Sequence, residues 1–184
     1  MIREEIILAY TKDKDVLDIG SVGQSNEYNL WKLLKTQGQT KSLWGVDTEP
    51  SDDEHIIQGS METCVLNKTF DVIIAGDVLE HVDNQGLFLD NIHHHLRDDG
   101  VLIITTPNAK WITAILKPNP THTLWHDRYT LLTILSLHGF HIKHFQYYVG
   151  NKLHYNIIKR ILAFRQGMMV ICKKGPVVRP EVIF

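Results

Sequence analysis

The chain has 184 residues, of which 43% are hydrophobic and 22% charged, as in an ordinary globular domain with a single sizeable core. Its formal net charge of −2 and sequence pI of about 6.6 provide no basic field, which argues against a protein that holds long duplex nucleic acid. Cysteine occurs only at Cys64 and Cys172, without a CxxC spacing, so neither a disulfide framework nor a zinc cluster is indicated. The acidic N-terminal residues and the lack of a long apolar run predict a soluble, cytoplasmic protein.

Apolar strand-like runs alternate with helical patterns along the chain, which predicts a mostly parallel sheet with helices on both faces. Strands are expected at 15–20, 42–47, 55–58, 70–75, 101–106, 140–149 and 167–173. Helices are expected at 2–12, 26–37, 84–97, 108–116 and 129–138, with a proline-containing loop at 117–120. Ser25 is the expected N-cap of the second of these helices, and Gly38 is expected to end it.

The first strand ends in a carboxylate and then breaks into glycines, in the run VLDIGSVG at 16–23. Missing side chains at Gly20 and Gly23 would let backbone N–H groups approach a ligand, although the same glycines could simply make a strand-to-helix turn. Asp18 stands two residues before the first glycine, where it would crowd a pyrophosphate but suits a cationic or amine-bearing ligand. The run therefore favours S-adenosylmethionine (SAM) over NAD.

The second strand also ends in a carboxylate, in the run LWGVD at 43–47. An acidic side chain at the tip of the next parallel strand can accept both hydroxyls of a ribose. Asp47 begins a stretch with good turn chemistry of its own, so a plain turn is the alternative. Its position after the second strand favours the ribose contact.

Two further runs follow at regular spacing, FDVIIAGDVLEHV at 70–82 and LRDDGVLIITTPN at 96–108. Together with the first two runs they resemble the class I SAM-dependent methyltransferases, over about 16–140. The resemblance is to the small-molecule branch, similar to methyltransferase types 11 and 12 and to quinone-biosynthesis O-methyltransferases. Val22 departs from the DxGxGxG pattern of that family, because it occupies the position of the second glycine.

The resemblance implies an α/β fold in one domain spanning 1–184. This fold is a Rossmann-like, doubly wound sheet of seven mostly parallel strands with an antiparallel last strand, arranged as a three-layer sandwich. The resemblance also implies SAM as cofactor and S-adenosylhomocysteine as product. The implied cofactor contacts are Asp18, Gly20, Ser21, Gly23, Asp47, Thr48, Ser60, Met61, Gly76 and Asp77. Ser60 and Met61 would meet the adenine edge, or alternatively cap a helix and fill the core.

Asp77, Glu80 and His81 have the spacing i, i+3 and i+4, so they share one face if a helical turn begins there. In quinone-biosynthesis O-methyltransferases this spacing is associated with a divalent cation. We expect no metal here, with Asp77 capping the turn and with Glu80 and His81 either pointing to solvent or supporting the cofactor loop. Asp77 would face the methionine portion and the transferable methyl group, and His81 is a candidate base for a hydroxyl.

The run THTLWHDRY at 121–129 follows the fifth strand, where the resembled enzymes shape the acceptor pocket. His126 could act as a general base oriented by Asp127, with Trp125 and Tyr129 as apolar walls. Asp127 is equally a good N-cap for the following helix. The consecutive histidines at 93–95 cannot all bind one ion, and a solvated helix face is expected there.

The sequence therefore predicts a SAM-dependent methyltransferase for a small molecule, with a hydroxyl of a sugar, lipid-linked or quinone-like compound as acceptor. A catalytically weak binding or regulatory subunit is the alternative, motivated by the altered loop at Val22. A nicotinamide-dependent dehydrogenase is disfavoured by Asp18. The basic amphipathic stretch at 151–166 would suit a weak peripheral membrane contact, or a helix that covers the sheet. The oligomeric state is left open.

Overall fold

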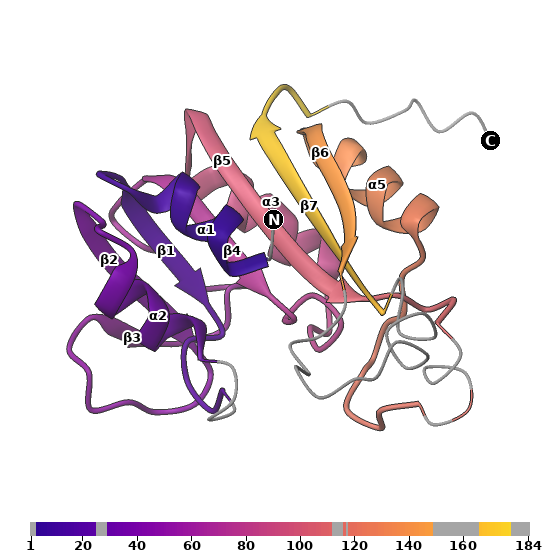
Figure 1. Cartoon of the computed structure of the whole chain (residues 1–184), viewed down its shortest axis with the longest axis horizontal. Coiled ribbons are helices and arrows are strands. Elements are labelled where there is room, and N and C mark those ends of the chain that lie inside the picture. The colour runs from indigo at the N-terminus through magenta and orange to yellow at the C-terminus, as the bar shows by residue number, and fades with distance from the viewer. Residues whose placement is uncertain (1–2, 25–28, 112–115, 117, 149–165, 178–184) are drawn as a thin grey trace.

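The computed structural model of the chain describes residues 3–24, 29–111, 116, 118–148 and 166–177. Figure 1 shows a twisted central sheet with helices packed on it. The strands are β1 (Asp15–Ile19), β2 (Ser42–Asp47), β3 (Ile56–Gln58), β4 (Phe70–Gly76), β5 (Leu96–Pro107), β6 (Phe140–Tyr148) and β7 (Gly167–Lys174). Their order is β3-β2-β1-β4-β5-β7-β6, and β7 runs opposite to the other strands. The predicted seven-stranded α/β sheet is confirmed.

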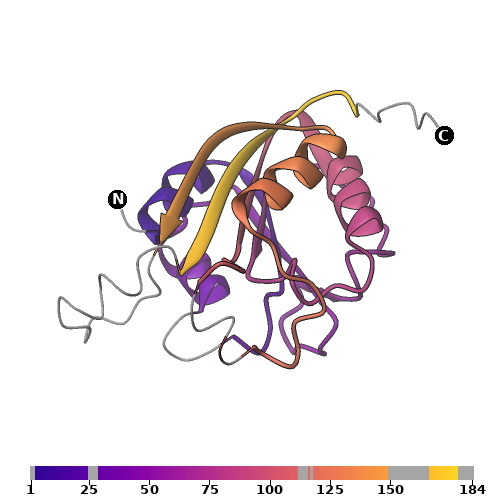
Figure 2. The same ribbon diagram turned by 90° about the vertical axis from the view of Figure 1, so that its right-hand side faces the viewer.

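Helices cover both faces of this sheet, because successive strand residues point to opposite sides and both sides are apolar. The helices are α1 (Arg3–Thr11), α2 (Leu30–Gln37), α3 (Gln85–His95) and α5 (Arg128–Leu137). Val16 and Ile74 pack in one core with α1 and α2, whereas Leu17 and Ile73 pack in the other with α3 and α5. Figure 2 shows these helix pairs on opposite sides of the sheet. No helix in the described ranges is long and apolar enough to cross a bilayer.

Several expected boundaries differ from the structure or fall outside the described residues. The N-cap of α2 is Asn29, whose side chain accepts a hydrogen bond from the backbone N–H of Lys32; the expected cap, Ser25, lies outside the described residues. Strand β5 begins at Leu96, earlier than predicted, because Leu96 pairs with Phe70 before the register shifts. The expected helix at 108–116 falls largely on undescribed residues, as does the basic stretch at 151–166 with its membrane contact.

The histidines at the end of α3 correct one prediction. His94 is exposed as expected, but His95 is buried, with Nε2 accepting from the backbone N–H of Leu66 at 2.9 Å and Nδ1 donating to the carbonyl of Asn91 at 2.8 Å. A buried backbone N–H needs an acceptor, and this imidazole supplies it. His95 therefore holds the loop before β4 against α3.

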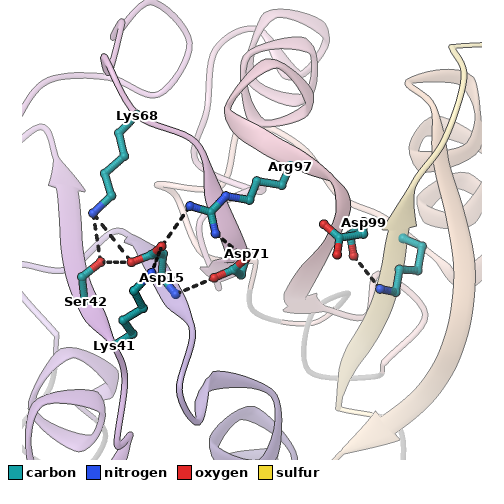
Figure 3. A network of polar contacts seen from close by, with 8 residues as sticks. Asp15, Lys41, Ser42, Lys68, Asp71, Arg97 and Asp99 are labelled. Atoms are coloured by element: carbon teal, nitrogen blue, oxygen red, sulfur yellow. Dashed lines mark hydrogen bonds and ion pairs between the residues drawn. The ribbon is translucent and has the colours of Figure 1, made fainter.

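A polar network joins the amino ends of β1, β2, β4 and β5, at the end of the sheet opposite the glycine loop (Figure 3). At its centre is buried Asp15, whose carboxylate accepts from Ser42 Oγ at 2.6 Å and from Arg97 Nη2 at 2.9 Å. The ion pairs of this network link Asp15 to Lys41, Lys68 and Arg97, and Arg97 to Asp71. The hydrogen bonds from Ser42, Arg97 and Lys41 lower the pKa of Asp15 to about 2. The network holds four strands in position.

The Asp15→Asn variant is expected to lower the free energy of unfolding by about 1–2 kcal/mol at pH 7. Because the folded pKa lies below the ordinary value of 3.8, this stabilisation is present above about pH 4 and is lost as the pH falls toward 2. Urea unfolding at pH 7 and pH 3 measures the effect. Asp98→Asn, at a fully exposed carboxylate that pairs with Lys174, is the matched control and should leave stability unchanged. Equal stability of the Asp15 variant and the wild type would contradict the assignment.

Candidate cofactor and active site

The predicted cofactor residues meet at the carboxyl ends of adjacent parallel strands, where open α/β sheets bind ligands. In the sheet register, Asp18 lies beside Gly45 of β2 and Ile74 of β4. Asp47 and Gly76 each follow two residues later, so they lie on the same face of the sheet as Asp18. The carboxyl ends of β1 and β5 both point toward the lower part of the molecule in Figure 1.

Asp18 is fully buried, and both oxygens of its carboxyl group lack a hydrogen-bond partner. The Ser21 hydroxyl donates at 2.8 Å to the backbone carbonyl of Asp18, so it supports the turn. Burial raises the pKa of Asp18 to about 8, and the negative charge of Asp47 acts in the same direction. A buried carboxyl group without a partner is costly, and a cationic ligand would satisfy it.

Asp47 at the end of β2 accepts two backbone hydrogen bonds, from Val22 N at 2.7 Å and from Glu49 N at 3.0 Å. The Glu49 contact is the expected turn, whereas the Val22 contact was not foreseen. Each bond uses a different carboxylate oxygen, and a carboxylate offers about four lone-pair positions. One position therefore remains on each oxygen, enough for the two hydroxyls of a ribose.

The remaining predicted cofactor residues shape the site mainly through their backbone. Gly20 and Gly23 have φ values of +79° and +68°, the left-handed region that favours glycine. The Ser60 hydroxyl accepts from Glu62 N at 3.2 Å in a turn, and no helix begins there in the described chain. Met61 is buried in the core as one alternative predicted. Thr48 is exposed. The adenine contact stays a prediction.

Asp77 has an unexpected pair of partners. Its carboxylate accepts from Arg3 Nη1 of α1 at 2.7 Å and from the Tyr148 hydroxyl of β6 at 2.9 Å. Asp77 has a φ of +56°, and the segment after it turns without forming a helix before Gln85, so its expected capping role is wrong. Arg3 also donates to Thr105 at 3.3 Å. The first helix is thereby tied to the end of β4.

Glu80 is buried, which rules out the first of its two expected alternatives, that it points to solvent. Its carboxylate accepts from Thr106 Oγ1 at 3.0 Å, and its carbonyl accepts from Thr123 N at 2.9 Å. Burial and the nearby Asp77 carboxylate raise the pKa of Glu80 well above its ordinary value. Glu80 therefore holds the segment after β5 against the turn after β4.

His81 is exposed, and its Nδ1 lies 3.0 Å from the carbonyl of Thr121. A carbonyl only accepts, so Nδ1 carries the proton and Nε2 keeps a free lone pair. The ring of His122 packs edge-on against His81 and also lies beside Trp125, with centroid distances of 4.7 Å in both cases. Burial and neighbouring His81 lower the pKa of His122, which keeps it neutral at pH 7.

Glu80, His81 and His122 offer ligand atoms within 4.8 Å of one another, a spacing that could hold a metal ion. This set differs from the one implied by the family resemblance, because Asp77 is held by Arg3 and Tyr148 instead. The spacing alone does not establish a metal site. The expectation of metal-free chemistry stays a prediction.

His126 differs from His81 in that its side chain is buried. The amide nitrogen of Gln85 lies 2.6 Å from His126 Nε2 and 3.3 Å from the Leu79 carbonyl, so it donates to both. The His126 proton is therefore assigned to Nδ1, and burial lowers the pKa of the ring. With its lone pair occupied, His126 is placed to support the segment after β5. A catalytic role for His126 stays a prediction.

Asp127 does not orient His126, so that hypothesis is wrong. Its side chain caps α5 by accepting from Thr130 N at 2.9 Å, and the Thr130 hydroxyl completes a capping box. Asp127 also forms an ion pair with Lys110 at 2.7 Å. Tyr129 is 73% exposed beneath Lys110, so it does not line a buried wall as predicted. The Asp127 carboxylate is therefore the N-cap of α5 and does not orient a catalytic base.

Known proteins share this arrangement of strands and loops. The sequence model of a family described as a methyltransferase domain matches residues 4–154. The chain belongs to this methyltransferase family. A ubiquinone biosynthesis O-methyltransferase from Rickettsia canadensis (strain McKiel) is 27% identical to this methyltransferase domain over an alignment of 101 positions, which covers 51% of this chain and 43% of the relative. The domain therefore spans less than half the length of that relative.

Solved methyltransferase structures have the same fold. One is a SAM-dependent methyltransferase from Clostridium acetobutylicum ATCC 824, with a TM-score of 0.68, 11% identity, and coverage of 95% of this chain and 93% of that chain. Another is the 1,6-didemethyltoxoflavin-N1-methyltransferase of Burkholderia thailandensis with its substrate and S-adenosylhomocysteine bound. Its TM-score is 0.68 at 18% identity, with coverage of 94% and 76%. At these low sequence identities the similarity shows a shared fold and nothing more.

Proposed function

We propose that this methyltransferase domain binds SAM and transfers its methyl group to a hydroxyl of a small molecule. The observation that carries the proposal is the buried, unpartnered carboxyl group of Asp18 beside the glycine loop, with Asp47 on the same face of the sheet. SAM, when bound, supplies an electrophilic methyl group on a positively charged sulfur. Asp18 would balance the ammonium group of the methionyl part, and Asp47 would bind the ribose hydroxyls.

On the acceptor side, His81 is the side chain best placed to take a proton. Its Nε2 lone pair is free and exposed, and the Thr121 carbonyl holds the ring in one tautomer. His122 and Trp125 extend from His81 as a ring-lined surface on which an acceptor could lie. We therefore favour oxygen methylation of a sugar, lipid-linked or quinone-like acceptor. The Rickettsia relative is a ubiquinone biosynthesis O-methyltransferase, which agrees with a quinone-like hydroxyl acceptor.

The test is calorimetric titration with SAM, with S-adenosylhomocysteine, and with NADH as the competing ligand. Micromolar or tighter binding of the two sulfur nucleosides supports the proposal. If NADH binds instead, the domain is a dehydrogenase-like protein. If neither sulfur nucleoside binds, the alternative of a methyltransferase-like binding or regulatory subunit gains support, because Val22 alters the loop of the family pattern.

The His81→Gln variant is expected to bind SAM as tightly as the wild type but to lose at least about 10²-fold in turnover, since general-base catalysis typically contributes that much. Turnover is measured as transfer of labelled methyl from SAM to a panel of sugar, lipid-linked and hydroquinone hydroxyls. His94→Gln, at an exposed position on α3, is the matched control and should have wild-type turnover. An active His81→Gln enzyme would remove His81 from the mechanism.

A further inference from the structure

The loop between β1 and α2 departs from the family pattern at a second place besides Val22. In the run DIGSVGQ at 18–24, the glycine expected at the last position is Gln24. A long polar side chain thus enters a loop in which small residues are the rule. Its side chain is partly buried and makes specific contacts at both ends of the loop.

The Gln24 amide bridges the end of β1 and the start of α2. Its Nε2 donates to the carbonyl of Gly20 at 2.5 Å. Its Oε1 accepts from the backbone N–H of Leu30 at 2.5 Å and, more weakly, from that of Trp31 at 3.4 Å. These two N–H groups belong to the first turn of the helix, which has no internal acceptors for them. Donating and accepting together require an amide, since a carboxylate of the same length only accepts.

Gly20 is tightly constrained by the residues around it, so a hydrogen bond to its carbonyl fixes the path of the loop. Gly20 has φ +79°, and a Cβ on it would lie 2.6 Å from Val78 Cγ2, so the loop is packed tightly against the segment after β4. The Gly20 N–H donates to the Val46 carbonyl at 2.9 Å. With Gln24 on its carbonyl, both polar backbone atoms of Gly20 are held, two residues after the unpartnered carboxyl group of Asp18.

The other side of the loop is held by Asp47, which accepts from Val22 N at 2.7 Å. The loop is therefore attached to β2 through Val22 and to α2 through Gln24. Both attachments fall at positions where this chain has a side chain in place of a family glycine. A loop held at two points is preorganised, and preorganisation lowers the conformational cost of binding a ligand.

We infer that Gln24 is a positioning residue of the cofactor loop, which holds the 20–24 backbone in the conformation that receives SAM. The inference rests on the proposed function, because it assigns the loop to that cofactor. Gln24 acts through the Gly20 carbonyl and the start of α2, and it need not touch the cofactor itself.

The test compares Gln24→Ala and Gln24→Glu with Asn29→Ala, measuring the Kd of S-adenosylhomocysteine by calorimetry and the Tm by circular dichroism. Gln24→Ala loses both contacts, whereas Gln24→Glu keeps the acceptor for Leu30 N but cannot donate to Gly20. Both variants are expected to raise the Kd about tenfold. Asn29→Ala removes the N-cap of the same helix but none of the contacts of the 20–24 backbone, so it should lower the Tm but keep the wild-type Kd.

The outcomes separate the inference from the proposed function. Wild-type affinity in both folded Gln24 variants overturns the inference while leaving the proposed function intact. An equal rise in Kd for Asn29→Ala also overturns it, because the effect would then belong to the stability of the helix start. Failure of the wild-type protein to bind the nucleoside overturns the proposed function, and the inference with it.

Discussion

The Asp18→Asn variant is expected to be more stable than the wild-type protein at pH 7, by about 1–3 kcal/mol, while binding SAM at least about tenfold more weakly. The folded pKa of Asp18 is about 8, above the ordinary aspartate value of 3.8. Between these pH values the unfolded chain has released a proton that the folded protein still holds, so stability falls as the pH rises from about 4 to 8. Because the asparagine side chain does not titrate, the variant should not lose stability over this pH range.

Urea unfolding of both proteins at pH 5 and pH 8 measures the first effect, and the advantage of the variant should grow with pH. Calorimetry at pH 7, in buffers of different ionisation enthalpy, measures the affinity for SAM and the number of protons released on binding. The wild type should release a proton when the cationic ligand ionises Asp18, and the variant should not. Asp83→Asn, at an exposed position after β4, is the matched control. Unchanged stability together with unchanged affinity would contradict the assignment of Asp18.

The sheet and the carboxyl-end site could be predicted because their signals are local. A strand that ends in a carboxylate and a glycine places both residues at the sheet edge, whatever the rest of the chain does. Parallel register then brings Asp18 and Asp47 onto one face. The carboxyl ends of the predicted strands agree closely with those of the structure, and these ends position the candidate cofactor residues.

The contacts that the sequence could not indicate join distant segments. Arg3 and Tyr148 lie 74 and 71 residues from Asp77 in the sequence, and neither belongs to a sequence motif that predicts a contact with Asp77. Glu80 and His95 are polar residues buried by their partners, which periodicity alone assigns to solvent. By its sequence position Asp127 could either cap the helix or orient His126, and its hydrogen bonds with Thr130 identify it as the cap.

The Asp47→Asn variant is expected to weaken binding of SAM about 10- to 100-fold, because a neutral amide replaces a charged acceptor of the ribose hydroxyls. One amide oxygen also cannot reproduce both backbone contacts, to Val22 N and Glu49 N. Affinity could therefore fall because the loop is released, with no ribose contact at all. A single measurement of the Kd does not separate these causes.

A cycle with two ligands separates them. Methylthioadenosine and its 2′-deoxy analogue differ by one ribose hydroxyl, and each is titrated into the wild type and the Asp47→Asn variant. If Asp47 accepts from that hydroxyl, the wild type should prefer methylthioadenosine, and the variant should lose about 1 kcal/mol or more of this preference. If Asp47 only clamps Val22, both ligands should weaken by the same factor. Equal losses would thus leave Asp47 as a loop residue and remove the ribose contact from the proposed site.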